Sequence, residues 1–371
     1  MTRVVLAPDS FKGTITAADA AVALAAGWAE VDPGAEFVHR PMADGGEGTV
    51  AAFAAAVPGA RHVPVTVEGP TGTMIEATWL LLPPTPDAAE GTAVIDLAST
   101  SGIELLEKLR PWDADTTGFG QAIAAALDHG VSRIVVGIGS SGSTDGGTGM
   151  LSALGARFLD AAGTPVARGA RGLDDIASVD LAGLRAAPEV RVLTDVTNPL
   201  VGPRGASAVF GPQKGLNSVT DITRADQGLG RLAALLGLDA DLPGTGAAGG
   251  TGGALVIWGG VLAPGAAEVA ELIGLADAIA DADIVITGEG SYDGQSGDGK
   301  VPSFIASLAA DAGAGARAML AAGRITDDSD TGLFAASASL TEIAGSSDAA
   351  LAEPARWLRK AGAVLAEAAA R

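Results

Sequence analysis

Several kinds of functional site are excluded by residues that this sequence lacks or contains in small numbers. The 371 residues include no cysteine, which excludes disulfide frameworks, thiolate metal centres and cysteine nucleophiles. The only histidines, His39, His62 and His129, are dispersed and lack the spacing of metal ligands. A zinc centre or a Ser-His-Asp triad built on them is therefore not indicated.

Positive charge is also scarce. The chain has 23 lysine and arginine residues against 44 aspartate and glutamate residues, a formal net charge of −21 and a pI near 4.4. Nucleic acids and anionic membranes are bound by broad basic surfaces, so neither is an expected partner. We expect small-molecule substrates and a monomer or homodimer.

Long hydrophobic runs are missing as well. The most apolar segment, 252–265, is too short and too rich in glycine to span a bilayer, and the first residues lack the long apolar stretch of a secretory signal. We therefore expect a cytoplasmic protein. Hydrophobic residues still make up 48% of the chain, enough for a large core, and the length predicts two domains.

The best-known nucleotide-binding motifs do not occur. The segment 139–149, GSSGSTDGGTG, follows a predicted strand and precedes a helix but lacks the GxGxxG spacing of a Rossmann site. No GxxxxGK[ST] loop is found, so any ATP site here does not use a Walker A loop.

What is present is an alternation of short β-rich runs with long alanine-rich helical segments. This alternation predicts an α/β fold with a largely parallel sheet. One section differs, because residues 62–82 alternate apolar and polar residues on both sides of the turn signal GPTG. That pattern predicts an antiparallel hairpin and hence an inserted domain of different architecture. The predicted strands are at 3–7, 36–41, 133–138, 190–194, 283–287 and 317–323.

Glycines and acidic residues are concentrated in a few loops. In open parallel sheets, ligands bind beyond the carboxyl ends of the strands, so loops that follow strands are the first candidates for a site. These loops are 7–13, 42–49, 139–149, 194–200, 210–215, 246–253 and 287–300.

The distribution of lysine points to phosphate binding in these loops. The chain has 5 lysines and 18 arginines, yet Lys12, Lys214 and Lys300 all lie in or at the end of glycine-rich loops. A compact ammonium beside backbone N–H groups is suited to phosphate oxygens. The alternative is that these lysines are simply solvated.

Carboxylates in the same loops suit a hard cation. Asp44 and Glu47 flank two glycines, and Glu289 and Asp293 lie in TGEGSYDG, a pattern that indicates Mg²⁺ ligands. Asp9, Asp145 and Asp195 each follow a predicted buried strand closely. For any one of them, helix capping or an Asx-turn is an equally good interpretation.

Together these segments resemble the type I glycerate kinase family. The resemblance rests on VVLAPDSFKGTITAADAA, PMADGGEGTV, TDVTNPLVGPRGASAVFGPQKG and DIVITGEGSYDGQSGDGKVP, with GSSGSTDGGTGML and GAAGGTGGAL between them. It implies an ATP-dependent kinase of D-glycerate that uses Mg²⁺ and yields 2-phosphoglycerate. Thr144 stands where the family pattern has asparagine, and the segment after Arg324 matches less well.

The resemblance also implies two α/β domains. A flavodoxin-like parallel-sheet domain would be built from both chain ends, residues 1–62 and 281–371. Residues 63–280 would form an inserted mixed α/β domain containing the β-hairpin, with the active cleft between the two domains.

Roles for individual residues follow as hypotheses from motif membership and charge type. Asp195, Lys12 and Asp9 are the catalytic candidates, with Asp195 favoured to orient or deprotonate the acceptor hydroxyl. Ser10, Asn198, Arg204, Lys214 and Arg324 are assigned to the substrate. Asp44, Glu47, Glu289 and Asp293 are assigned to the metal. The nucleotide and its phosphates are assigned to Gly45, Gly46, Ser141, Ser143, Gly146, Gly249, Gly250, Gly290 and Lys300.

Two other functions remain open at this point. A kinase for another small hydroxy acid would keep the same site, because nothing in the loops measures the length of the acceptor. A non-catalytic sugar-acid-binding protein would be favoured if the acidic loops had lost their charges, but they are intact. A nicotinamide-dependent oxidoreductase lacks its glycine fingerprint.

Overall fold

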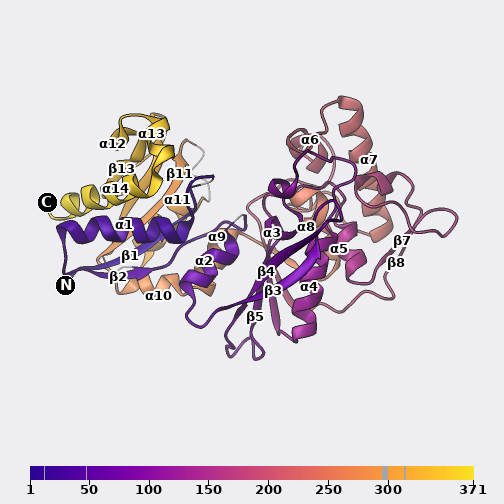
Figure 1. Ribbon diagram of the computed structural model, residues 1–371, viewed down its shortest axis with the longest axis horizontal. Coiled ribbons are helices and arrows are strands. Elements are labelled where there is room, and N and C mark those ends of the chain that lie inside the picture. The colour runs from indigo at the N-terminus through magenta and orange to yellow at the C-terminus, as the bar shows by residue number, and fades with distance from the viewer. Residues whose placement is uncertain (12, 47, 295–299, 313–314) are drawn as a thin grey trace. The chain divides into compact units, whose positions relative to one another are not determined.

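The computed structural model describes the chain except for residues 12, 47, 295–299 and 313–314 (Figure 1). Contacts within the chain divide it into two compact units. The first unit combines Met1–Asp44, Ala51–Pro58 and Ala266–Arg371, and the second combines Gly45–Val50 with Gly59–Gly265. No helix among the described residues is both long enough and apolar enough to cross a membrane.

The first unit contains a five-stranded sheet in which every pairing is parallel. Its order is β13-β12-β11-β1-β2, so the chain runs outward in one direction from β1 to β2 and in the other from β11 to β13. This is the strand order of flavodoxin-like folds, and the switch point lies between β1 and β11. The strands are β1 Arg3–Pro8, β2 Glu36–His39, β11 Ile284–Tyr292, β12 Arg317–Ile325 and β13 Ala336–Ser339.

Two long helices pack side by side in this unit (Figure 1). Helix α1 (Ala17–Val31) begins at Thr16, whose hydroxyl accepts a hydrogen bond from Asp19 N, and α14 is Pro354–Ala369. Their backbones touch where glycine removes the side chain, because a Cβ at Gly27 would lie 1.8 Å from Arg359 O. The unit's other helices are α2 Thr49–Ala56, α9 Gly265–Leu272, α10 Leu275–Ala280, α11 Val301–Asp311, α12 Leu340–Ala344 and α13 Ser347–Ala352.

The second unit contains a six-stranded mixed sheet of order β10-β9-β6-β5-β4-β3. The hairpin β3–β4 joins β5 antiparallel, whereas β5, β6, β9 and β10 are parallel neighbours. The strands are β3 Arg61–Glu68, β4 Met74–Leu82, β5 Thr92–Asp96, β6 Arg133–Gly137, β9 Glu189–Leu193 and β10 Val261–Ala263. A separate hairpin pairs β7 (Arg157–Leu159) with β8 (Ser178–Asp180).

Alternation along these strands builds the core of the second unit. Ile134 and Val136 of β6, like Val190 and Val192 of β9, face one side, where helices cover them. The helices of this unit are α3 Ala98–Ser101, α4 Thr117–His129, α5 Thr148–Ala153, α6 Ala206–Phe210, α7 Val219–Leu236 and α8 Thr251–Ile257. The 3-10 turns are η1 Ile103–Leu105, η2 Ala170–Asp174, η3 Pro212–Lys214 and η4 Ala247–Gly250.

The structure confirms the predicted fold class and corrects one element. A parallel flavodoxin-like sheet and a mixed sheet bearing the predicted hairpin are both present. The prediction that a loop begins at residue 287 is wrong, because β11 continues to Tyr292 and therefore includes Glu289 and Gly290. The long neighbour β12 supplies its partners, with Glu289 beside Ala322. The domain boundaries at 62/63 and 280/281 stay a prediction.

Candidate functional site

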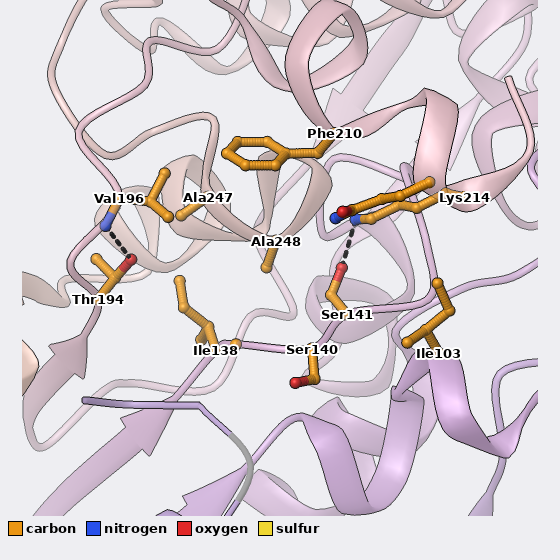
Figure 2. A pocket seen from close by; sticks show the side chains of 12 residues that line it. Ile103, Ile138, Ser140, Ser141, Thr194, Val196, Phe210, Lys214, Ala247 and Ala248 are labelled. Carbon is orange, nitrogen blue, oxygen red and sulfur yellow. Dashed lines mark hydrogen bonds between the residues drawn. The ribbon is translucent and has the colours of Figure 1, made fainter. Parts of the chain in front are cut away.

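A pocket of about 350 Å³ lies beyond the carboxyl ends of β6 and β9 in the second unit (Figure 2). The loop after β6, the loop after β9, the turn from α6 into η3, and η4 all contribute to its wall. Most of the wall is apolar, and the phenyl ring of Phe210 lies across from Ile138. The lining residues are Ile103, Ile138, Gly139, Ser140, Ser141, Thr194, Val196, Phe210, Gln213, Lys214, Ala247 and Ala248.

Among the lining residues that the structure describes, Lys214 is the only one with an ionisable side chain. It is 3% exposed, and its Nζ donates a 2.6 Å hydrogen bond to Ser141 Oγ (Figure 2). A second hydrogen bond of 2.6 Å runs from Nζ to Ser143 O. Burial lowers the pKa of Lys214 to about 7, while the charge of Asp145 acts in the opposite direction. The pocket therefore holds a partly desolvated ammonium, which is a strong local attraction for an anion.

The pocket wall also contains unusual backbone conformations. Ser140 and Ala248 have φ values of 57° and 53°, and within the described part of the chain they alone combine positive φ with a side chain. Both line the pocket. Such conformations cost about 1–3 kcal/mol and cluster at functional sites, so their position marks this pocket as a candidate site.

Two of the predicted glycine-rich loops meet beside Lys214. Gly146 N donates a 3.0 Å hydrogen bond to Gly249 O, and a Cβ at Gly249 would lie 2.2 Å from Ser143 O. A Cβ at Gly250 would likewise lie 2.9 Å from the Cα of Gly146. The structure thus brings these predicted phosphate-binding residues together around the backbone that Lys214 contacts.

The predicted residues Gly45 and Gly46 lie against the same loop. Gly139 N donates a 3.0 Å hydrogen bond to Gly45 O, and a Cβ at Gly139 would lie 2.5 Å from the Cα of Gly46. Gly45 has a φ of 93° and packs on the backbone of Leu193 at the end of β9. Glycine is therefore required here by backbone packing, whatever ligand binds.

Residues predicted in the loop after β9 lie beside the pocket rather than in its lining. Asp195 is exposed, and its Oδ1 accepts a 2.9 Å hydrogen bond from Gly265 N, while its neighbours Thr194 and Val196 line the pocket. Asn198 Nδ2 donates a 2.7 Å hydrogen bond to the carbonyl oxygen of Arg204 and so closes the following turn. The Arg204 side chain is exposed.

A second group of predicted residues lies at the switch point of the first unit's sheet. Asp9 follows β1, is 9% exposed, and donates through its backbone N to Gly288 O of β11. Its Oδ1 accepts a hydrogen bond from Ser10 N. Glu289 and Gly290 continue β11 at the same edge. This edge is where flavodoxin-like sheets bind ligands.

The remaining predicted residues of the first unit lie near the end of β11 and in the loop after β2. Lys300 Nζ lies 3.6 Å from Asp293 Oδ1, and Arg324 donates a 3.2 Å hydrogen bond to Ser291 Oγ. Asp44, in the loop after β2, is half-buried. Among the residues that the structure describes, no three carboxylate or imidazole side chains form a group able to hold a metal ion. Lys12 and Glu47 lie outside the described residues.

Three residues in or directly behind the pocket were not among the predicted site residues. Asp145 is fully buried directly behind the Lys214 contacts, Phe210 supplies an aromatic wall, and Ala248 has a strained backbone. The motif FGPQKG signals Phe210 and Lys214 together in the sequence. Nothing in the sequence signals the conformation of Ala248, because alanine gives no hint of positive φ.

Comparisons with known proteins agree on one family. The glycerate kinase family model matches residues 4–370. The chain is 42% identical over 320 residues to glycerate 2-kinase of Escherichia coli (strain K12), covering 83% of this chain and 82% of the relative. It is 40% identical over 320 residues to glycerate kinase of Bacillus subtilis (strain 168), covering 83% and 81%.

A solved structure matches the whole fold. It is the crystal structure of a Salmonella typhimurium LT2 protein assigned to glycerate kinase 2, with a TM-score of 0.84 and 38% sequence identity. The match covers 99% of this chain and 97% of that one.

Proposed function

The chain belongs to the glycerate kinase family, and on that premise we propose that it transfers the γ-phosphoryl group of ATP to D-glycerate, forming 2-phosphoglycerate. Membership of a kinase family implies ATP as the co-substrate. The product, the metal and the residue roles below are parts of the proposal.

The observation that carries the proposal is the buried ammonium of Lys214 in a pocket bordered by the glycine-rich loops 139–149 and 246–253. We assign this pocket to the nucleotide, with its phosphates at Lys214 and the apolar wall around Phe210 available to the base. Lys214 was predicted to bind the acceptor. Its bonds to Ser141 and Ser143, both predicted phosphate-binding residues, favour the donor instead.

Phosphoryl transfer requires positioning and charge stabilisation more than covalent chemistry. In this proposal Lys214, with Lys12 and Lys300, compensates the charge of the phosphates. Asp195 orients or deprotonates the acceptor hydroxyl, and Asp9 is the alternative for that role. Asp9 is the more buried of the two carboxylates.

Binding of the acceptor is assigned to polar groups that can reach a carboxylate and two hydroxyls. The proposed residues are Ser10, Asn198, Arg204 and Arg324. Arg204 and Arg324 are exposed, and a guanidinium can bind a carboxylate through two parallel hydrogen bonds. One N–H of the Asn198 amide donates to Arg204 O, and its second N–H and its oxygen are the groups proposed to meet the ligand.

Mg²⁺ is the metal that the proposed reaction calls for. It binds proteins through one or two carboxylates, with phosphate oxygens and water completing an octahedron. Glu289 and Asp293 at the end of β11 are carboxylates of this kind, and Asp44 and Glu47 are the other proposed ligands. Bound to the phosphates, the ion would neutralise the charge that develops during transfer.

The test of this function is turnover with identification of the product. Purified protein, ATP, Mg²⁺ and D-glycerate are mixed, ADP release is followed, and the product is assigned by phosphorus NMR. The proposal predicts a 2-phosphoglycerate signal. A 3-phosphoglycerate signal would contradict the proposed position of attack while keeping the kinase.

Absence of turnover with glycerate would contradict the acceptor. A panel of small hydroxy acids would then test the alternative kinase, and silence across the panel would favour a sugar-acid-binding protein. Asp195→Asn is expected to lower kcat by about 100-fold, the size typical of a general base. Near-normal turnover would remove Asp195 from that role.

A further inference from the structure

The carboxylate of Asp145 is fully buried and hydrogen-bonded on all sides. Its Oδ2 accepts from Thr116 N, Thr116 Oγ1 and Gly149 N at 2.8–3.1 Å. Its Oδ1 accepts from Ser143 Oγ and Gly147 N at 3.2 and 3.1 Å. A carboxylate that accepts this many hydrogen bonds is held in one orientation, and the bonds favour its ionised form.

Asp145 and Lys214 are linked through one residue. Lys214 Nζ donates to Ser143 O, and Ser143 Oγ donates to Asp145. Within the described residues no carboxylate lies within salt-bridge distance of Lys214. The negative charge of Asp145 therefore acts on Lys214 through the electrostatic field rather than by contact. That field opposes burial by raising the pKa of Lys214.

The charges around this pair are few. The described pocket residues that face Lys214 from η1, the loop after β9, α6 and η4 are uncharged. Burial raises the pKa of the Asp145 carboxyl, and the charge of Asp115 behind it raises that pKa further. Asp115 is itself paired with Arg168, whose Nε lies 2.6 Å from Asp115 Oδ2.

We propose that Asp145 is a positioning residue for the phosphate site: it fixes the turn 141–149 and supplies the negative charge that accompanies the Lys214 ammonium. This inference rests on the proposed function, because it concerns the same nucleotide pocket. Asp145 itself does not line the pocket, so it acts through Ser143 and Lys214.

The arrangement requires a carboxylate rather than an amide. Five donors face Asp145, and an asparagine side chain would present its own NH₂ group to some of them. Asp145→Asn therefore removes the charge and weakens the turn together. Thr116→Val is the matched variant, because it keeps the charge of Asp145 while it removes the hydroxyl that donates to the carboxylate and accepts from Met150 N.

The experiment measures the affinity for ADP with Mg²⁺ by isothermal titration over a range of pH, in the wild type, Asp145→Asn and Thr116→Val. For Asp145→Asn we expect affinity to fall by about tenfold or more below pH 7, as when a buried charge loses its partner. We also expect the loss of ADP affinity at high pH to begin at a lower pH in this variant than in the wild type. For Thr116→Val we expect the loss of ADP affinity at high pH to occur at the same pH as in the wild type. The loss of ADP affinity at low pH should begin at a higher pH than in the wild type.

Several results would overturn the proposal. If Asp145→Asn binds ADP as tightly as the wild type and loses affinity at the same high pH, the proposed role of the Asp145 charge is contradicted. If the pH at which ADP affinity is lost at high pH falls equally in Thr116→Val and in Asp145→Asn, the role of Asp145 is only structural. If Asp145→Asn does not fold, Thr116→Val is the variant that tests the proposal. A loss of ADP affinity at the same low pH as in the wild type would then contradict it.

A ligand-free measurement separates this inference from the proposed function. A double-mutant cycle of Asp145→Asn and Lys214→Met on urea unfolding should give a favourable coupling below pH 7 that disappears well above it. No coupling at either pH would contradict the inference even if the protein phosphorylates glycerate. Coupling without glycerate turnover would count against the proposed function alone.

Discussion

At the scale of single residues, the side chain of Lys214 combines a charge with almost complete burial. Removing an ammonium from water disfavours its charged form, and two hydrogen bonds to Ser141 and Ser143 compensate only in part. A lysine ammonium has three donors, so one N–H remains for a ligand. The phosphates of a nucleotide supply both the acceptor and the opposite charge.

Lys214→Met should weaken nucleotide binding. The substitution keeps an unbranched side chain and removes the ammonium, and a hydrogen bond to a charged group contributes about 1.5–3 kcal/mol. We expect the affinity for ADP below pH 7 to fall by about 10- to 100-fold. Titration calorimetry measures it. Lys108→Met is the control, because Lys108 is exposed in the same unit and does not line the pocket.

The same group predicts a pH dependence of binding. The pKa of Lys214 is lowered to about 7, so the ammonium is present below that pH and is lost as the pH rises through it. Wild-type ADP affinity should therefore decline above about pH 7. A constant affinity across this range would contradict the assignment of the phosphates to Lys214.

Stability should also depend on this titration. The folded pKa of about 7 lies below the unfolded value of 10.5, so between these limits the unfolded chain binds more protons. The free energy of unfolding of the wild type, relative to Lys214→Met, should rise with pH in that window. Urea unfolding of both proteins at several pH values measures the difference, and a falling difference would contradict the buried ammonium.

Ala248 offers a test of stored backbone strain. Its φ of 53° is costly with a Cβ, so Ala248→Gly should stabilise the fold by about 1 kcal/mol. The neighbouring Ala247 is buried in η4 without positive φ, and Ala247→Gly should destabilise by a similar amount. Urea unfolding compares the two variants. Loss of stability in both would mean that Ala248 is not strained.

At the scale of elements, the pocket depends on two loops whose backbones touch. Gly249→Ala should destabilise the fold by about 3 kcal/mol and weaken ADP binding, since its Cβ would lie 2.2 Å from Ser143 O. Gly237 is the matched control: its φ of 67° is nearly that of Gly249, 66°, but its Cβ would have nothing within 4 Å. Gly237→Ala should cost only about 1 kcal/mol and leave ADP binding unchanged.

Unfolding and calorimetry on the two alanine variants decide this prediction. Equal effects would show that the backbone conformation matters and the close approach does not. Wild-type ADP affinity in Gly249→Ala would contradict the dependence of the phosphate site on the loop contact.

Local signals in the sequence predicted the elements whose positions are determined by residues close by in the chain. The GPTG turn between alternating residues located the hairpin β3–β4. The extension of β11 through Glu289 could not be predicted, because its glycines resemble a loop and only pairing with β12 keeps them in a strand.

In the candidate site, too, features set by nearby residues could be predicted, and features set by contacts between distant segments could not. The charge of Lys214 and its place in a glycine-rich loop are visible in the sequence, and they are the reason that it was singled out. The contacts of the buried Lys214 with Ser141 and Ser143, and the two hydrogen bonds of Asp145 with Thr116, join segments that are far apart in the chain. Spacing alone could not predict them.

At the scale of the whole molecule, the two units have different sheets. Periodicity predicts strands and helices but not the order in which strands pair, and the order β2-β1-β11 requires segments from both ends of the chain. The flavodoxin-like unit was therefore expected from the family resemblance rather than from the pattern. The family match over residues 4–370 includes the segment after Arg324, where the resemblance was weaker.

The most direct test of this account is the position of a bound nucleotide. A crystal structure of the protein with ADP and Mg²⁺ should place a phosphate oxygen about 3 Å from Lys214 Nζ, within the pocket walled by Ile138, Phe210 and Ala248. A nucleotide bound elsewhere, with this pocket free of phosphate, would contradict the central claim.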